Sequence, residues 1–433
     1  MMDLRERANR VRAWLAARTP RQLLLAGWVT CILLCYPGYL SFDSIEQLGQ
    51  ARSGHFTDAY APVMTGVWSL CEWIFAGPFP MLALQTGLFV FGAYGVLKRA
   101  LSPRAAAVVA VGVLAAPPVF APMAVIWPDS LMAGALLAAA AALLDERRAM
   151  KAAGAVALVI AGGCRPEVAP ATIPLAMLAL PASLSGRLRR AGLAVALVVA
   201  CSGVARLVGW ILVDDDTYAW QQRLEWIDVV GTLRRAHADD PMPGLTVVDR
   251  ARLLEGHDAY DAYVLTHGPK RVAEPIADDA QSEALSAAWH AAIADHFGAY
   301  ATHRGELMLR QLGITHPWLP VFDDFGDPDH LMLLHHRATP SDLEIAWRAI
   351  VHVVALTPLF RPLLYVLLAI PAIVLARRRR ELLALVASGV MYEIIQLPLA
   401  SSVDYRFSHW LVATVWLVLV ALAVARKPAW RAS

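Results

Sequence analysis

The sequence predicts an all-α polytopic membrane protein of about ten transmembrane helices, with a mainly helical extracytoplasmic domain inserted after the seventh. The first reason is composition: of 433 residues, 58% are hydrophobic and only 17% are charged. Soluble domains carry about a quarter charged residues, so this balance indicates a membrane protein. The other reasons are a succession of apolar segments and a separation of basic from acidic residues along the chain.

Ten apolar segments approach the length of about 20 residues that a helix needs to cross a bilayer. The set is 22–40, 79–97, 105–127, 130–144, 152–164, 168–184, 191–213, 360–376, 382–400 and 408–425. Three of them, 130–144, 152–164 and 168–184, are short for full spans. We therefore predict about ten spans, with both chain ends on the same side of the membrane.

The basic residues give the orientation. Of the 38 Lys and Arg, 22 lie in an N-terminal arm and in short alternate connections, at 5–21, 98–104, 147–151, 187–190, 377–380 and 426–431. Short loops rich in Lys and Arg remain in the cytoplasm. That side is therefore predicted to be cytoplasmic, and the remaining connections to lie on the outer face.

The segment 214–345 differs from the rest of the chain. It holds 23 of the 36 acidic residues and only 10 basic ones. It is too long and too polar for a hairpin loop, so we expect a folded extracytoplasmic domain. The predicted organisation is a cytoplasmic arm (1–21), an N-terminal transmembrane module (22–213) with a long first outer loop (41–78), this domain, and a C-terminal transmembrane module (346–433).

Charged residues also collect near the outer ends of the apolar segments. Ionisable groups close to the membrane are costly, so they tend to have partners and to face a polar cavity. Their convergence from four connections predicts one cavity, whereas snorkelling or solvated loop ends would explain each residue singly. The residues are Asp43, Glu46, Arg52, His55, Asp58, Glu72, Asp129, Arg165, Glu167, Asp404, Arg406 and His409.

Four short stretches carry a family resemblance. They are DSIEQLGQARSGHFTDAYAPVMTGVWSL from Asp43, AVIWPDSLMAG around Asp129, GGCRPEVAPATIPL around Arg165, and PLASSVDYRFSHWL around Arg406. Their order and sidedness resemble the GT-C superfamily of membrane glycosyltransferases, over 22–213 and again at 398–410. The resemblance implies a polyprenyl-phosphate sugar donor, a cell-envelope glycan, lipid or protein acceptor, and an active site facing the periplasm of a bacterial inner membrane.

The resemblance assigns roles to the acids. Asp43 is the preferred general base, because it lies where a lipid headgroup and a periplasmic acceptor would meet. Many family members begin this loop with two adjacent acids, whereas here Ser44 follows Asp43. Either Asp43 acts alone or Glu46, one helical turn later, supplies the second carboxylate. Asp129 is the third catalytic candidate. Two plainer readings remain: Asp43 caps a helix, and Asp129 is an acid at a helix N-terminus.

The basic candidates would hold the donor phosphate. Arg406 is the best of them, because a guanidinium binds phosphate oxygens in a bidentate way and stays charged. Asp404, Tyr405 and His409 flank it as further headgroup-binding candidates. The aromatic side chains of Tyr405, Phe407 and Trp410 suit an interface where isoprenoid and water meet. The alternative is an aromatic belt with a snorkelling Arg406.

Arg165 is the second basic candidate, with Glu167 or Asp129 as its partner. A purely structural Arg165–Asp129 ion pair is an equally good interpretation.

No metal or nucleic-acid partner is predicted. The stretch FDDFGDPDHLMLLHH (322–336) has oxygen and imidazole groups, but its spacing matches no defined site, so a divalent ion is only a minor alternative. The basic runs flank apolar segments and the long polar segment is acidic, which argues against nucleic-acid binding. The other hypotheses are a flippase or permease, an envelope glycan ligase or polymerase, and a binding role for 214–345.

Overall fold

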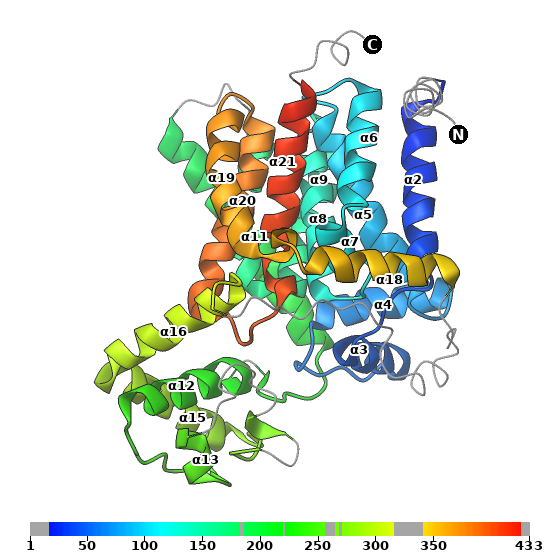
Figure 1. Ribbon diagram of the computed structural model, residues 1–433. Coiled ribbons are helices and arrows are strands. Elements are labelled where there is room, and N and C mark those ends of the chain that lie inside the picture. The colour runs from blue at the N-terminus through cyan, green and yellow to red at the C-terminus, as the bar shows by residue number, and fades with distance from the viewer. Residues whose placement is uncertain are drawn as a thin grey trace.

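The computed structural model describes residues 17–181, 186–219, 221–255, 265–267, 271–315 and 341–425 (Figure 1). Within these ranges the regular structure is helical, apart from three isolated β-bridges. The prediction of an all-helical chain is confirmed for this part of the protein.

An apolar helical bundle forms the larger part of the molecule. Each of the ten apolar segments contains helix: α2 (Pro20–Cys35), α5 (Phe79–Leu97), α6 (Pro103–Leu114) with α7 (Pro117–Met123), α8 (Pro128–Leu143), α9 (Arg148–Cys164), α10 (Ala169–Ala176), α11 (Arg187–Leu212), α19 (Pro362–Ala376), α20 (Arg380–Leu399) and α21 (His409–Ala425). Among the described residues, the helices α5, α11, α20 and the run Tyr405–Ala425 are four that are long and apolar enough to cross a membrane. Counting the α6–α7 pair raises the number to five.

The segment 105–127 is not the single span predicted from its hydropathy. It forms α6 and α7, whose axes differ by 69° across the break at Ala115 and Ala116. Pro117 and Pro118 follow the break directly. A proline removes a backbone donor and disfavours helical geometry in the residue before it, so the helix ends there and restarts in a new direction.

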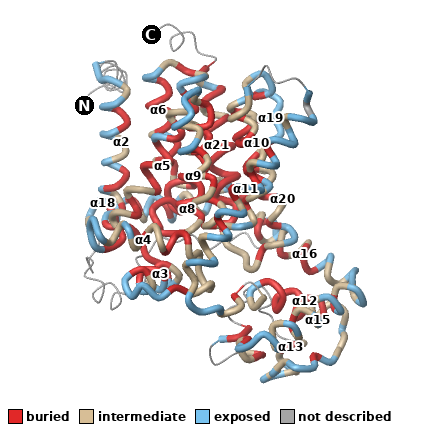
Figure 2. The backbone as a smooth tube through the Cα atoms, turned by 180° about the vertical axis from the view of Figure 1, so that it is seen from behind, coloured by how far each residue is buried: buried red, intermediate tan, exposed pale blue. Residues whose placement is uncertain are grey.

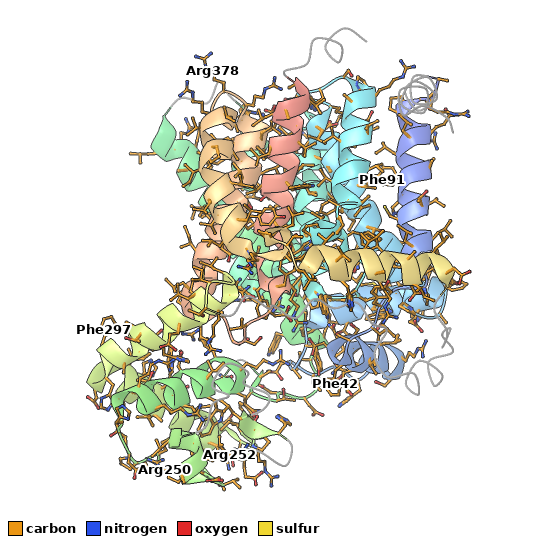
Figure 3. All side chains as sticks on the ribbon, in the orientation of Figure 1. Phe42, Phe91, Arg250, Arg252, Phe297 and Arg378 are labelled. Carbon is orange, nitrogen blue, oxygen red and sulfur yellow. The ribbon has the colours of Figure 1, made fainter. Side chains whose placement is uncertain are left out.

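The bundle has two chemically different ends. Figure 1 shows the start of α2 and the end of α21 at one end and the smaller helical unit at the other. The first, here called the basic end, carries Lys98, Arg99, Arg147 and Arg378, the last of which is labelled in Figure 3. The opposite end carries the short helices α3 (Phe42–Ser53) and α4 (Pro62–Ile74).

Helix α18 (Asp342–Ala355) lies across the bundle near the end that carries α3 and α4 (Figure 1). Its Trp347 and Val351 belong to the bundle core, and the Trp347 ring lies 5.1 Å from the ring of Phe120. Its exposed face carries Leu343 and Val353, which are 60% and 65% exposed. An amphipathic helix of this kind suits a membrane interface. The predicted domain boundary at 345/346 therefore falls inside a helix that packs on the bundle.

The smaller unit has its own core. It comprises α12 (Trp226–Ala236), α13 (Arg250–Glu255), α15 (Asp279–Asp295) and α16 (Phe297–Gln311). Trp226, Ile227 and Leu285 are among its buried residues, and Figure 2 shows this buried group apart from the larger one in the bundle. Arg304 fastens the unit to the bundle by donating to Asp228 Oδ2 at 2.7 Å and to the Ala400 carbonyl at 2.6 Å.

Close packing of α5 on α8 gives the first testable prediction. A Cβ atom added to Gly92 would lie 2.6 Å from the backbone nitrogen of Ala138, whereas one added to Gly112 would meet nothing within 4 Å. Gly92→Ala is therefore expected to lower the free energy of unfolding by about 1–3 kcal/mol. Gly112→Ala, in the same bundle, should raise it by about 0.5–1 kcal/mol. Thermal unfolding in detergent measures both, and equal midpoints would contradict the prediction.

Candidate functional site

The first loop is fixed to the start of α8 by backbone and side-chain contacts. Tyr39 N donates to the Ala124 carbonyl at 2.9 Å, and Ile126 N donates to the Tyr39 carbonyl at 3.0 Å. Trp127 Nε1 donates to Ser41 Oγ at 2.8 Å. Ser41 is also the N-cap of α3, with its hydroxyl accepting from Ser44 N. The capping role weighed for Asp43 is therefore filled by Ser41, which leaves the Asp43 carboxylate available for another partner.

That partner is Arg406. Its Nη1 donates to Asp43 Oδ2 at 2.8 Å, although the two residues are 363 positions apart. Asp404 lies on the other side of the guanidinium, with Oδ2 at 3.1 Å from Arg406 Nε. The indole of Trp127 lies 4.8 Å from the guanidinium carbon, within range of a cation–π contact. The Asp43 side chain is 33% exposed and that of Arg406 is 16% exposed, so solvent reaches this pair.

A second arginine is paired beside the first. Arg165 binds Asp129 through two hydrogen bonds, of 3.0 Å and 2.6 Å, and lies 3.7 Å from Glu167. Asp129 is fully buried at the first turn of α8. The ring of Phe407 lies 4.9 Å from the Arg165 guanidinium carbon and 5.4 Å from that of Arg406, so it bridges the two pairs.

We call this group the arginine cluster and define it as Asp43, Asp129, Arg165, Glu167, Asp404 and Arg406. Six of the twelve charged residues predicted to share one cavity thus lie together, drawn from four separate connections. The cluster holds four carboxylates for two guanidinium groups. Every arginine charge is therefore matched within the protein before any ligand binds.

The charge of Asp43 follows from two opposing effects. Burial alone would raise the pKa of this carboxyl, but the Arg406 guanidinium, with further contributions from Arg223 and Arg165, holds the pKa below its usual value. Asp43 is therefore ionised at neutral pH as long as Arg406 remains its partner.

Four of the remaining outer residues stabilise the loops and do not join the cluster; they are Arg52, His55, Asp58 and Glu72. Arg52 pairs with Glu72 at 2.8 Å, and His55 Nε2 lies 2.8 Å from Asp215 Oδ2. Asp58 accepts from Thr217 N at 2.6 Å and from Ala219 N at 3.1 Å. The prediction of a single cavity for all twelve is wrong, because these four residues connect the first loop to itself or to the segment that begins at Asp214.

Three further candidates lie elsewhere than predicted. Glu46 is exposed on α3. Tyr405 is 2% exposed, with its hydroxyl donating to the Pro118 carbonyl at 2.9 Å, and His409 is buried with Nε2 at 3.1 Å from the Val119 carbonyl. Trp410 is also fully buried, and its Nε1 donates to Ser388 Oγ. The expected aromatic interface at Tyr405 and Trp410 is wrong, because both polar tips find partners inside the bundle.

One residue near the cluster was not predicted. Arg223 lies in the one-turn π-helix Gln221–Glu225, with its guanidinium carbon 5.5 Å from the ring of Tyr60, and its charge acts on Asp43. Its signal in the sequence is weak: it is the first basic residue after Asp214–Asp216, in a segment that is otherwise acidic.

Metal-binding residues do not gather in the part of the chain that the structure describes: no three His, Cys, Asp or Glu side chains there form a group that could hold an ion. The stretch 322–336, the minor metal alternative, lies outside the described residues.

Comparisons with protein-family models, with curated proteins and with solved structures found no match for this chain. The grounds for a functional assignment are therefore the chemistry of the arginine cluster and its position in the bundle.

Proposed function

We propose that this protein is a membrane glycosyltransferase, similar to the GT-C enzymes, that moves a sugar from a polyprenyl-phosphate donor to an envelope acceptor. The observation that carries the proposal is the 2.8 Å pair between Asp43 and Arg406, two residues from opposite ends of the chain. A carboxylate beside a guanidinium supplies a base and an anion ligand at one point. A structural ion pair accounts for Arg165 and Asp129, because Asp129 is fully buried, whereas the carboxylate of Asp43 is 33% exposed and can be reached by an acceptor.

The position of the cluster suits a lipid-linked substrate. Ten spans with the basic end in the cytoplasm would place the arginine cluster at the periplasmic surface, where the phosphate of a polyprenyl lipid lies. Arg406 offers further N–H groups to phosphate oxygens, and Trp127 and Phe407 form apolar walls beside it. Arg165 carries a second positive charge across the Phe407 ring. Together these groups would hold a phosphate ester that displaces Asp43 from Arg406.

The reaction is a single inverting displacement. Asp43 takes the proton from an acceptor hydroxyl, and the acceptor oxygen attacks the anomeric carbon of the donor sugar. The bond from that carbon to the phosphate oxygen breaks, and its electron pair leaves with polyprenyl phosphate. Arg406 stabilises the negative charge that grows on the phosphate. The products are a glycosylated acceptor, polyprenyl phosphate and protonated Asp43, which returns its proton to water.

Donor binding would also activate the base. A phosphate on Arg406 competes with Asp43 for the same guanidinium, and the carboxylate then loses the charge that lowers its pKa. Burial remains and raises the pKa of Asp43, which makes it a stronger base only when the donor is present.

This activation predicts a difference between two pH profiles. The acid limb of kcat/KM reports the free enzyme, and that of kcat reports the donor complex. Because the pKa of Asp43 in the free protein lies below the ordinary value of 3.8, activity by kcat/KM should persist to about pH 4. The limb of kcat should lie at higher pH. Coincident limbs in steady-state rates measured from pH 3 to pH 8 would refute this role for Arg406.

The test of the proposed function uses purified full-length protein in lipid. Polyprenyl-phosphate sugars, and a polyprenyl-diphosphate oligosaccharide as the donor of a ligase or polymerase, are supplied with an envelope extract as acceptor. Release of polyprenyl phosphate together with labelled acceptor is the expected result. Release from the diphosphate donor alone would assign a ligase or polymerase instead. Absence of cleavage with every donor would overturn the proposal.

Transport is the second candidate, and one observation favours it. The α6–α7 pair is an apolar segment bent by 69°, and broken helices line the substrate sites of secondary transporters. A transporter would move a lipid or solute across the bilayer without breaking the sugar–phosphate bond. Movement of labelled donor between leaflets of proteoliposomes, with no cleavage, would select this function.

A further inference from the structure

The basic end of the bundle carries a groove that the proposed reaction does not use. It has a volume of about 530 Å³ and is bordered by residues of α2, α5, α8 and the α8–α9 connection. Leu88 and Phe91 of α5 form part of its apolar wall, and Phe91 is 39% exposed. Figure 3 shows Phe91 on the side of the bundle next to α2, far from Arg378. The arginine cluster lies at the opposite end.

The groove exists because its floor is made of small residues. Its lining includes Gly92 and Gly95 of α5, which face Ala138 and Ala141 of α8, and Gly87, which faces Trp28 of α2. The helices approach so closely that a Cβ atom on Gly95 would lie 2.6 Å from that of Ala141. Gly92 and Gly95 send no side chain into the groove, and Trp28 of α2 closes the space beside Gly87. The open part of the groove is long enough for part of an extended apolar chain.

The mouth of the groove is positively charged. Arg21, Lys98, Arg99 and Arg147 line it, and all four are exposed, while Asp145 is the one acid in the lining. Asp145 is already held by Arg147 Nε at 3.0 Å. Arg99 uses Nη2 to donate to the Leu144 carbonyl at 3.0 Å, which fixes its position and leaves its other N–H groups for a ligand.

We propose that this groove binds an anionic phospholipid of the membrane leaflet at the basic end. The phosphodiester would be held by Arg21, Lys98 and Arg99, and an acyl chain would lie along Leu88 and Phe91. The groove complements such a lipid in charge and polarity. The cations at its mouth would bind the phosphate, and its apolar wall would contact the acyl chain. A zwitterionic lipid would gain less, because its own ammonium group opposes the four cations.

The experiment is lipid binding to the purified full-length protein, followed by native mass spectrometry. Phosphatidylglycerol and phosphatidylcholine with identical acyl chains are titrated separately. We expect the wild type to prefer phosphatidylglycerol, and Arg21→Gln/Lys98→Gln to weaken that binding about tenfold or more. The matched control is Arg377→Gln/Arg378→Gln, which removes two exposed charges from the same end outside the groove. It should bind phosphatidylglycerol as the wild type does.

Three results would overturn the proposal. They are equal binding of the two lipids by the wild type, equal losses in the two double variants, and displacement of bound phosphatidylglycerol by an equimolar amount of polyprenyl phosphate. The last would make the groove a polyprenyl-phosphate site instead. If Arg21→Gln/Lys98→Gln does not fold, Lys98→Gln alone serves, with an expected loss of about fivefold. None of these measurements depends on enzymatic activity.

Discussion

Replacing Asp43 with asparagine is expected to lower the rate of sugar transfer by a factor of about 10²–10⁴, the usual contribution of a general base. Asparagine has the same shape and still accepts a hydrogen bond from Arg406, so the 2.8 Å contact and the fold should survive. It cannot take a proton from the acceptor. Polyprenyl phosphate released per minute, at saturating donor, is the quantity to measure.

Glu46→Gln is the matched control for this change. It removes the same charge from the same helix, three residues away, at a side chain that is exposed. Its activity should stay within about twofold of the wild type, because surface charges away from a reaction contribute little. If both variants retain full activity, Asp43 is not the base. If Glu46→Gln alone loses activity, the second acid of the family pattern is the catalytic one.

The fold class was predictable because it depends on composition. Apolar segments with so few charges are expected to form helices, because a helix hydrogen-bonds its own backbone N–H and C=O groups. Pro117 and Pro118 mark the break between α6 and α7 in the sequence. Hydropathy is averaged over about 19 residues, so two prolines within an apolar segment do not change it enough to reveal the break. The domain boundary at 345/346 came from the acidic composition of 214–345, which carries no information on the contacts that α18 makes with α2 and α7.

The site was predictable only as a set of candidates. Position near the ends of apolar segments singled out Asp43, Arg165 and Arg406, but no spacing rule connects residues 363 positions apart. Their pairing depends on how the bundle closes, which also decides that Ser41 caps α3 and that Tyr405 points inward. Side-chain partners inside the bundle override the preference of Tyr and Trp for an interface. The sequence pattern therefore identifies the charged residues, and only the packing of the helices shows which of them form ion pairs.

The second large effect concerns stability. Asp129→Asn is expected to lower the free energy of unfolding by about 3 kcal/mol, near the lower end of the range for breaking a buried ion pair. Asp129 is fully buried and takes both hydrogen bonds from Arg165, which is itself 20% exposed and can recover some hydration. Among the described residues, Glu167 is then the carboxylate that still pairs with Arg165, with its Oε1 3.7 Å from Arg165 Nη1. Unfolding in mixed micelles measures the loss.

Two further variants test whether the loss of stability comes from an uncompensated charge. Asp145→Asn breaks an exposed pair with Arg147 at the other end of the bundle and should leave the unfolding curve unchanged. Asp129→Asn combined with Arg165→Gln removes both charges and should recover much of the stability, because no unpaired guanidinium remains in the bundle. Equal destabilisation by the single and double variants would mean that packing around Asp129 matters more than its charge. Recovery of stability without recovery of sugar transfer would show that Arg165 also acts on the donor.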